Sequence, residues 1–276
     1  MIPCLGIDIG GSGIKGAPVD TETGRLVRDR VRIPTPVPSR PAAVAAAVAR
    51  ISRQFGEGDR IGCTIPGVVI RGVIRTCPNL DPGWVGTDAH ALLGRATDRT
   101  VVVLNDADAA GLAEMAFGAG RGRGGVVLMV TLGTGIGSAL FLDGRLVPNT
   151  EMGHLEIRGR DAERRASARV RDQRHLSWKT WAAHLDEYLE RVEALLNPEL
   201  IILGGGVSAR ADRFLPRLHP ACEVVAAQLQ NDAGIVGAAL HARAAVEAAQ
   251  GEAGGALARP LPAARRARPI LNGRSE

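Results

Sequence analysis

The stretch Ile9-Gly10-Gly11-Ser12-Gly13-Ile14 joins two runs that both have the character of β-strands. Residues 2–9 before it are largely apolar, and residues 14–19 after it alternate well enough for a strand. A second stretch, Leu132-Gly133-Thr134-Gly135-Ile136, joins strand-like runs at residues 125–132 and 136–142. Two halves that each open with strand, glycine turn and strand indicate a duplicated domain, with a cleft between the copies.

The rest of the chain alternates between strand-like and helical patterns. Apolar residues recur at helical spacing, or follow a strand end, in three segments: residues 41–55, 106–117 and 178–196. Further strand-like runs stand at residues 25–33, 60–76, 101–104 and 201–203. We therefore predict an α/β fold with a smaller N-terminal lobe (residues 1–105) and a larger C-terminal lobe (residues 106–250). We expect the last helix to pack back on the N-terminal lobe.

Composition narrows the class of protein. The chain has 276 residues, of which 45% are hydrophobic and 23% charged, with a net charge of +5, as in an ordinary soluble protein. No apolar run reaches the length of a membrane helix, and no signal peptide precedes the first strand. The four cysteines lie far apart without a CxxC pair, which predicts reduced thiols in a cytoplasmic protein. Residues 251–276 lack a periodic apolar face, so we expect a disordered tail.

The two glycine turns are candidates for phosphate binding. A glycine turn lets the backbone approach an anion and point N–H groups at it. Neither turn is a P-loop, and neither opens a helix as a dinucleotide fingerprint does. Two such turns can grip a phosphate from both sides, although each alone could be an ordinary tight hairpin. Asp8 at the end of the first strand could hold a hydrated Mg²⁺, and Lys15 could neutralise phosphate or be a surface lysine.

Polar residues also stand where the strand at residues 101–104 ends. Asn105 and Asp106 follow this strand directly, at the position where open α/β sheets bind ligands. Both residue types also cap helices, but a cap needs only one of them. A second polar group at residues 149–156 contains Glu151 and His154, and Glu163 follows it. Such side chains suit a hydroxyl-rich substrate, and Asp106 is the candidate general base, although His154 could also be structural.

These segments resemble the bacterial sugar-kinase branch of the ROK (repressor, open reading frame, kinase) family, and within it the polyphosphate glucokinases of actinobacteria. The resemblance covers about residues 4–240, in order and at compatible spacing. The matching strings are GIDIGGSGIKG (6–16), TIPGVV (64–69), LNDADAAG (104–111), LGTGIG (132–137), NTEMGH (149–154), GGGVS (204–208) and QNDAG (230–234). The resemblance implies a two-lobed actin-like ATPase (ribonuclease H-like) fold. It also implies phosphoryl transfer from inorganic polyphosphate, and possibly ATP, to the 6-hydroxyl of glucose, with a divalent cation such as Mg²⁺.

The resemblance also implies roles for individual residues of this sequence, at the positions that match the family's motifs. Asp106 matches the family's catalytic base. The positions that match or fall at its glucose contacts are Gly67, Asn79, Asn105, Asp106, Glu151, His154 and Glu163. Those that match its donor-phosphate turns are Asp8, Gly10, Gly11, Ser12, Gly13, Lys15, Thr131, Gly133, Thr134, Gly135, Gly204, Gly205 and Gly206. Many members bind structural zinc through cysteines after the GH motif; residues 159–167 here contain none, so we expect no zinc. A homodimer is also implied.

Residues 158–174 contain seven arginines and three acidic residues, which suit either a polyphosphate track or a solvated surface.

Three other functional assignments compete with a polyphosphate glucokinase. A ROK-type repressor would need a DNA-reading segment before the first glycine turn, which begins at residue 10, so we expect no nucleic-acid partner. A sugar sensor without catalysis would not need Asp8, Lys15 and Asp106 together. The closest alternative is an ATP-dependent ROK glucokinase or glucomannokinase.

Overall fold

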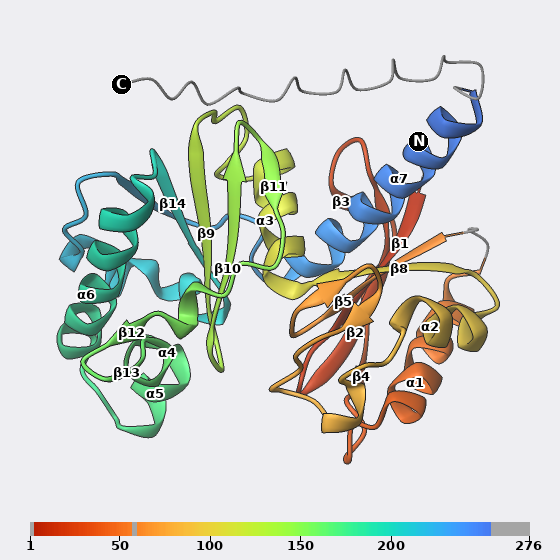
Figure 1. Ribbon diagram of the computed structural model, residues 1–276, viewed down its shortest axis with the longest axis horizontal. Helices are drawn as coiled ribbons and strands as arrows, with labels where there is room; N and C mark the ends of the chain where they lie inside the picture. The colour runs from red at the N-terminus through yellow and green to blue at the C-terminus, as the bar shows by residue number, and fades with distance from the viewer. Residues whose placement is uncertain (1–2, 57–59, 255–276) are drawn as a thin grey trace, which may run out of the picture.

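The computed structural model describes residues 3–56 and 60–254, with side chains described up to residue 248. Two β-sheets stand side by side with helices between and outside them (Figure 1). Most of the predicted tail lies outside the described residues; residues 251–254, which we assigned to it, belong to the last helix, α7 (Ala233–Gly254). No helix among the described residues combines the length and apolarity that a bilayer crossing requires.

The first sheet has six strands and belongs to the N-terminal part of the chain. Its strands run in the order β3-β2-β1-β5-β8, and β4 pairs with β2 beside β3. Their bounds are β1 (Pro3–Ile9), β2 (Gly13–Asp20), β3 (Arg25–Leu26), β4 (Val31–Pro34), β5 (Arg60–Ile65) and β8 (Thr100–Asn105). β1 and β2 are antiparallel, whereas β1, β5 and β8 run parallel to one another. The single strand predicted at residues 25–33 is therefore two short strands, β3 and β4.

The second sheet repeats this arrangement. Its order is β11-β10-β9-β14-β15, with β9 and β10 antiparallel and the steps from β9 through β14 to β15 parallel. The bounds are β9 (Val126–Leu132), β10 (Ile136–Leu142), β11 (Arg145–Val147), β14 (Leu200–Gly204) and β15 (Glu223–Ala226). Each glycine turn thus joins the second and third strands in the order of its sheet. The duplication predicted from the two turns is confirmed by this common strand order.

Helices cover both faces of each sheet. Helices α1 (Pro41–Gln54) and α2 (Ala89–Thr97) cover the outer face of the first sheet, and α6 (Trp178–Leu196) covers the outer face of the second (Figure 1). α3 (Asp106–Phe117) and α7 lie between the sheets and pack against each other. α7 also packs along β1 and β5 of the first sheet. The apolar core of this middle layer joins residues from both sheets, which sets their relative position.

The remaining elements are short. They are a hairpin of β6 (Val69–Ile70) and β7 (Val73–Ile74), a hairpin of β12 (Glu156–Ile157) and β13 (Arg160–Asp161), and the helices α4 (Glu163–Ala166) and α5 (Ala168–Gln173). Arg71 and Gly72 form the turn of the first hairpin and both have positive φ, as a two-residue hairpin turn of this kind requires. The chain after β14 forms a 3₁₀ segment (Gly206–Arg213) with a kink at Arg210. Five 3₁₀ segments occur among the described residues: Pro82–Trp84, Met152–His154, Gly206–Arg213, Leu215–Arg217 and Gln230–Asp232.

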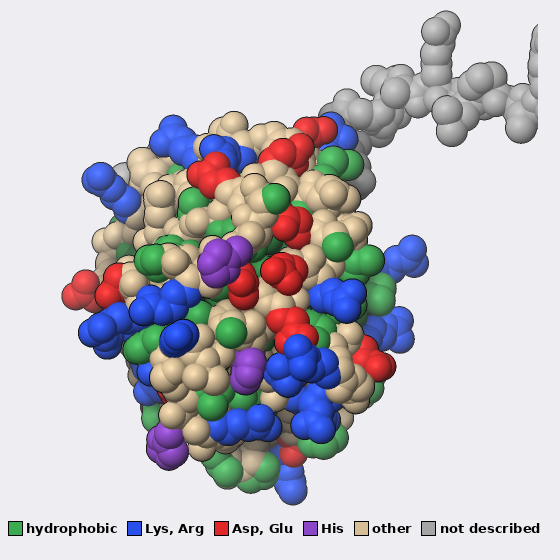
Figure 2. Space-filling view, turned by 90° about the vertical axis from the view of Figure 1, so that its left-hand side faces the viewer, with side chains coloured by type: hydrophobic (Ala, Val, Ile, Leu, Met, Phe, Trp, Pro, Cys, Tyr) green, Lys and Arg blue, Asp and Glu red, His purple; other side chains and the backbone are tan. Residues whose placement is uncertain are grey.

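The arginine-rich segment at residues 158–174 does not form one continuous free track. Arg158 and Arg165 both bond the carboxylate of Glu187 on α6, at 2.6 and 3.1 Å. Arg171 pairs with Asp172 and stacks on the ring of Trp178, 3.6 Å from its centre. Figure 2 shows the face that carries α6, where basic side chains stand in separate groups with acidic ones between them. Three of the seven arginines therefore hold the local fold together, and the side chains of the other four, Arg160, Arg164, Arg169 and Arg174, are exposed.

Candidate functional site

The two glycine turns face the same cleft between the sheets. The cleft has a volume of about 1030 Å³, and its walls include Gly10 to Ser12 of the first turn and Gly133 to Gly135 of the second. Each turn is closed by one backbone hydrogen bond, Gly10 N to Gly13 O at 3.1 Å and Gly133 N to Gly135 O at 3.0 Å. Main-chain N–H groups without bulky side chains thus lie on both sides of the space, as phosphate binding requires.

A third glycine comes to the cleft from the end of β14. Gly205 has φ +85°, and a Cβ there would lie 2.3 Å from the carbonyl oxygen of Leu132, so only glycine fits. Its neighbours Gly204 and Gly206 do not line the cleft. Gly204 instead packs against Met129, whose methyl carbon would be 2.4 Å from an added Cβ. Of the three predicted glycines, Gly205 is the one at the cleft wall.

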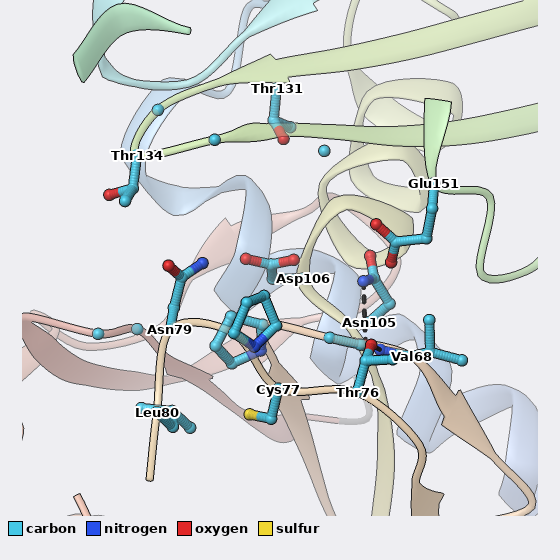
Figure 3. A pocket seen from close by; sticks show the side chains of 18 of the residues that line it. Val68, Thr76, Cys77, Asn79, Leu80, Asn105, Asp106, Thr131, Thr134 and Glu151 are labelled. Carbon is cyan, nitrogen blue, oxygen red and sulfur yellow. Dashed lines mark hydrogen bonds between the residues drawn. The ribbon is translucent and has the colours of Figure 1, made fainter. Parts of the chain in front are cut away.

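Asn105 and Asp106 divide between them the two roles that the sequence left open. Asn105 is the N-cap of α3: its Oδ1 accepts hydrogen bonds from Ala107 N (2.7 Å) and Asp108 N (3.0 Å). Its Nδ2 donates to the carbonyl of Gly67 at 3.1 Å, shown by the dashed line in Figure 3. The cap is therefore complete without Asp106, whose carboxylate lies in the cleft between Thr134 and Glu151 (Figure 3).

The Asp106 carboxyl has the electrostatics of a general base. Burial is the main cause that raises its pKa from 3.8 to about 7, and the nearby negative charge of Asp8 is the second. Glu151 adds a smaller effect in the same direction, whereas a bond from Ala107 N opposes it. A carboxylate whose pKa is near neutrality both ionises at working pH and accepts a proton readily.

Asp8 and Lys15 form an ion pair behind the first glycine turn. They face each other in the register of β1 and β2, with Lys15 Nζ 3.1 Å from Asp8 Oδ2. The other oxygen of Asp8 accepts a bond from Thr64 Oγ1 at 2.9 Å. Neither residue lines the cleft, and Gly13 does not either, because the guanidinium of Arg32 lies against it. Both Asp8 oxygens are thus engaged, which fits a cation held through water molecules rather than directly.

The residues predicted to contact a sugar come together in this cleft. Gly67, Asn79, Asn105, Asp106, Glu151, His154 and Glu163 all line it, although they come from five separate parts of the chain. Burial raises the pKa of Glu151; the His154 ring lowers it and Glu163 raises it further. Glu163 lies under the second glycine turn, where its Oε2 accepts from Ile136 N at 3.3 Å. Thr131 and Thr134, predicted on the donor side, also line the cleft.

His154 is held at the cleft edge by two acidic residues. Its Nδ1 is 3.3 Å from Asp161 Oδ2, and its Nε2 is 3.9 Å from Glu151 Oε2. His154, Asp161 and Glu163 together place three possible metal ligands within 4.8 Å of one another. All three side chains are partly or fully exposed; His154 pairs with Asp161, and Glu163 accepts from Ile136 N.

One wall of the cleft was predicted only in part, through Gly67 and Asn79. Residues 66–68 and 75–85, on either side of the hairpin β6–β7, provide it, and the lining residues that were not predicted include Val68, Thr76, Cys77 and Val85. Arg75 is the one arginine in the described lining, and it is exposed. A positive residue between two strand-like runs carries no signal by itself, so the sequence did not distinguish it from surface arginines. The string at residues 64–69 was the available sign that this loop faces a ligand.

Comparison with known proteins agrees with the resemblance. The ROK family matches residues 4–169. Polyphosphate glucokinase of Mycobacterium leprae (strain TN) is 48% identical over 243 residues, covering 88% of this chain and 75% of that protein. Polyphosphate glucokinase of Mycobacterium tuberculosis (strain CDC 1551 / Oshkosh) is 48% identical over 237 residues, covering 86% and 89%.

Solved structures show the same fold. The inorganic polyphosphate/ATP-glucomannokinase of Arthrobacter sp. strain KM superposes with a TM-score of 0.86 at 49% identity, covering 89% of this chain and all of that one. The ROK family glucokinase of Streptomyces griseus, in complex with glucose and AMPPNP, gives 0.75 at 26% identity, covering 88% and 99%. The predicted actin-like two-lobed fold is thereby confirmed, and the chain belongs to the ROK family.

Proposed function

We propose that the protein is a polyphosphate-dependent glucokinase, which transfers a phosphoryl group from inorganic polyphosphate to the 6-hydroxyl of glucose. The observation that carries the proposal is the Asp106 carboxylate, which lies in the cleft and is not needed for the helix cap. The relatives of 48% identity that bear the name polyphosphate glucokinase support the donor and the acceptor. ATP is a second donor in this proposal, supported by the polyphosphate/ATP-glucomannokinase of similar identity.

In the proposed mechanism the glucose 6-hydroxyl attacks the terminal phosphorus in line. The hydroxyl proton passes to Asp106, the new O–P bond forms, and the bond to the shortened polyphosphate breaks. Glu151, His154 and Asn105 hold the sugar hydroxyls, and the two glycine turns hold the donor from both sides. Orientation of the two reactants is worth roughly 7–11 kcal/mol, more than the base alone, so the geometry of the cleft dominates the rate.

The residues present fit a hydrated divalent cation near the first turn. Asp8 and Asp106 are close enough that one raises the pKa of the other, and a cation would stabilise both. Mg²⁺ bound there through water would neutralise charge on the transferring phosphoryl group. A homodimer and a cytoplasmic location are further proposals that the family resemblance supports.

A donor comparison tests the proposal. Purified protein is incubated with glucose, Mg²⁺ and either polyphosphate or ATP, and glucose 6-phosphate is measured. We expect product with polyphosphate, and with ATP as second donor. Product with ATP but none with polyphosphate would favour the alternative of an ATP-dependent ROK glucokinase. Mannose in place of glucose tests the glucomannokinase alternative, which the similarity to the Arthrobacter glucomannokinase supports.

A further inference from the structure

Asn149 makes an unusual link between the two halves of the molecule. It follows β11 of the second sheet, and its side-chain amide bonds the main chain of Val69 in β6. Val69 N donates to Asn149 Oδ1 at 2.8 Å, and Asn149 Nδ2 donates to Val69 O at 2.9 Å. One amide side chain thus satisfies both main-chain groups of one residue, as a neighbouring strand would.

The backbone of Asn149 is fixed from behind. Its N–H donates to Asp108 Oδ2 at 2.8 Å, and Asp108 is 1% exposed in the first turn of α3. Asn149 has φ +61°, a conformation that asparagine tolerates better than most residues. The side chain that we grouped with the polar sugar-binding segment therefore faces the β6–β7 hairpin. It is held there by its own backbone geometry and by a buried carboxylate.

The hairpin has little else to hold its β6 edge. β6 and β7 form a separate two-stranded sheet, and such a hairpin is marginally stable by itself. The β7 side is attached through main-chain bonds to the segment that leads into α2, such as Ile74 N to Thr87 O at 3.0 Å. On the β6 side, Val69 bonds Asn149 through both of its main-chain groups. Within the described residues, Asn149 thus occupies the place of a third strand.

Both ends of this link border the cleft. Val68, beside Val69, lines one wall, and Glu151, two residues after Asn149, lines the opposite one (Figure 3). The separation of these walls depends on the bonds of Asn149. We propose that Asn149 is a positioning residue that clamps the β6–β7 hairpin to the loop carrying Glu151 and thereby sets the width of the sugar end of the cleft. This inference rests on the proposed sugar acceptor.

The test uses Asn149→Gly in the full chain, because glycine accepts the positive φ and removes only the amide. Amide hydrogen exchange at Val69 should become fast in the variant, since its acceptor is gone. The KM for glucose at saturating donor should rise about tenfold or more, as expected from two lost hydrogen bonds. The kcat should change less than about threefold, and the KM for the donor at saturating glucose should stay unchanged.

Two variants serve as controls. Asn197→Gly makes the same substitution at another asparagine of positive φ, the exposed C-cap of α6, and should leave all these quantities unchanged. Asp108→Asn keeps an oxygen that accepts from Asn149 N and should leave the exchange at Val69 and both KM values as in the wild type. The clamp is refuted if Asn149→Gly leaves Val69 protected, or exposes it without raising the glucose KM. An equal rise in donor KM would also refute it, because that indicates a general loss of structure. If the wild type phosphorylates no sugar, the proposed function fails, and the exchange measurement still decides whether the bond holds the hairpin.

Discussion

Substituting Asp106 with asparagine should inactivate the enzyme and stabilise its fold. The amide keeps the size of the side chain and its bond from Ala107 N, but it can neither accept the proton nor carry charge. A positioned base is worth about 10²–10⁴-fold in rate, so kcat should fall by that factor. Glucose binding, which depends on the other lining residues, should change by less than about threefold in calorimetry.

The effect on stability follows from the pKa of the same carboxyl. Because folding raises it from 3.8 to about 7, the folded state binds the proton more tightly, and ionisation destabilises the fold. The protonated Asp106 carboxyl contributes its full share of the free energy of unfolding below about pH 4. This contribution falls as the pH rises through about 7, where the carboxyl ionises in the folded state. At about 1.4 kcal/mol for each pH unit, the loss is at most about 4 kcal/mol at pH 8. Asp106→Asn should recover part of it there, and nothing at pH 4.

Urea unfolding at pH 4, 6 and 8 measures this difference, with kcat measured on the same preparations. Asp108→Asn is the matched control: burial also raises the pKa of Asp108 to about 7, but this carboxyl faces Asn149 and not the cleft. It should gain stability at pH 8 and keep its activity. An Asp106→Asn variant with near-full kcat would disprove the role of base. A variant less stable than the wild type at pH 8 would disprove the electrostatic reasoning.

Three other outcomes are expected. The kcat/KM of the wild type should increase as the pH rises through about 7, because the free enzyme must lose the Asp106 proton; a rate independent of pH from 5 to 9 would contradict this. The KM for polyphosphate should fall with chain length and rise with salt, whereas equal use of short and long chains would count against binding by the arginines of residues 158–174. Gly205→Ala should lower the free energy of unfolding by about 1–3 kcal/mol in denaturant titrations and weaken donor binding, since its φ is +85° and its Cβ would overlap the Leu132 carbonyl; unchanged stability would show that the turn relaxes freely.

The sequence predicts the sheets well because their signals are local. Alternating residues on each side of a glycine turn define a hairpin, and the two copies at Gly10 and Gly133 lead to the same strand order. The pairing of Asp8 with Lys15 was also accessible, since a hairpin closed between Ile9 and Ile14 places these two residues opposite each other. From residue type alone, Asp8 was expected to hold Mg²⁺ and Lys15 to neutralise phosphate. The register of the two strands shows in addition that these side chains face each other and pair.

Other features depend on contacts that no local pattern encodes. Whether Asn105 or Asp106 caps α3 is decided by the Gly67 carbonyl, which lies 38 residues away in the chain and binds the Asn105 amide. The wall at residues 66–85 is irregular, and its position depends on Asn149 from the other sheet. Sequence periodicity predicts a helix or strand from the residues of that element alone. It therefore cannot predict the position of a loop that is held by hydrogen bonds to residues distant in the chain.

The charge of the cleft limits how a polyanionic donor can bind. Asp106, Glu151 and Glu163 line it, whereas Arg75 is its one described arginine and most arginines of residues 158–174 are paired or directed to the surface. A polyphosphate chain that entered alone would add negative charge beside Asp106 and Glu151, whose pKa values are already raised by burial and by neighbouring carboxylates. The donor must therefore enter with its own cations, and their charge would lower the pKa of Asp106 in the complex. Within the cleft, the glycine turns can then orient and closely contact the donor through N–H groups, while most of the compensating charge there comes with the substrate.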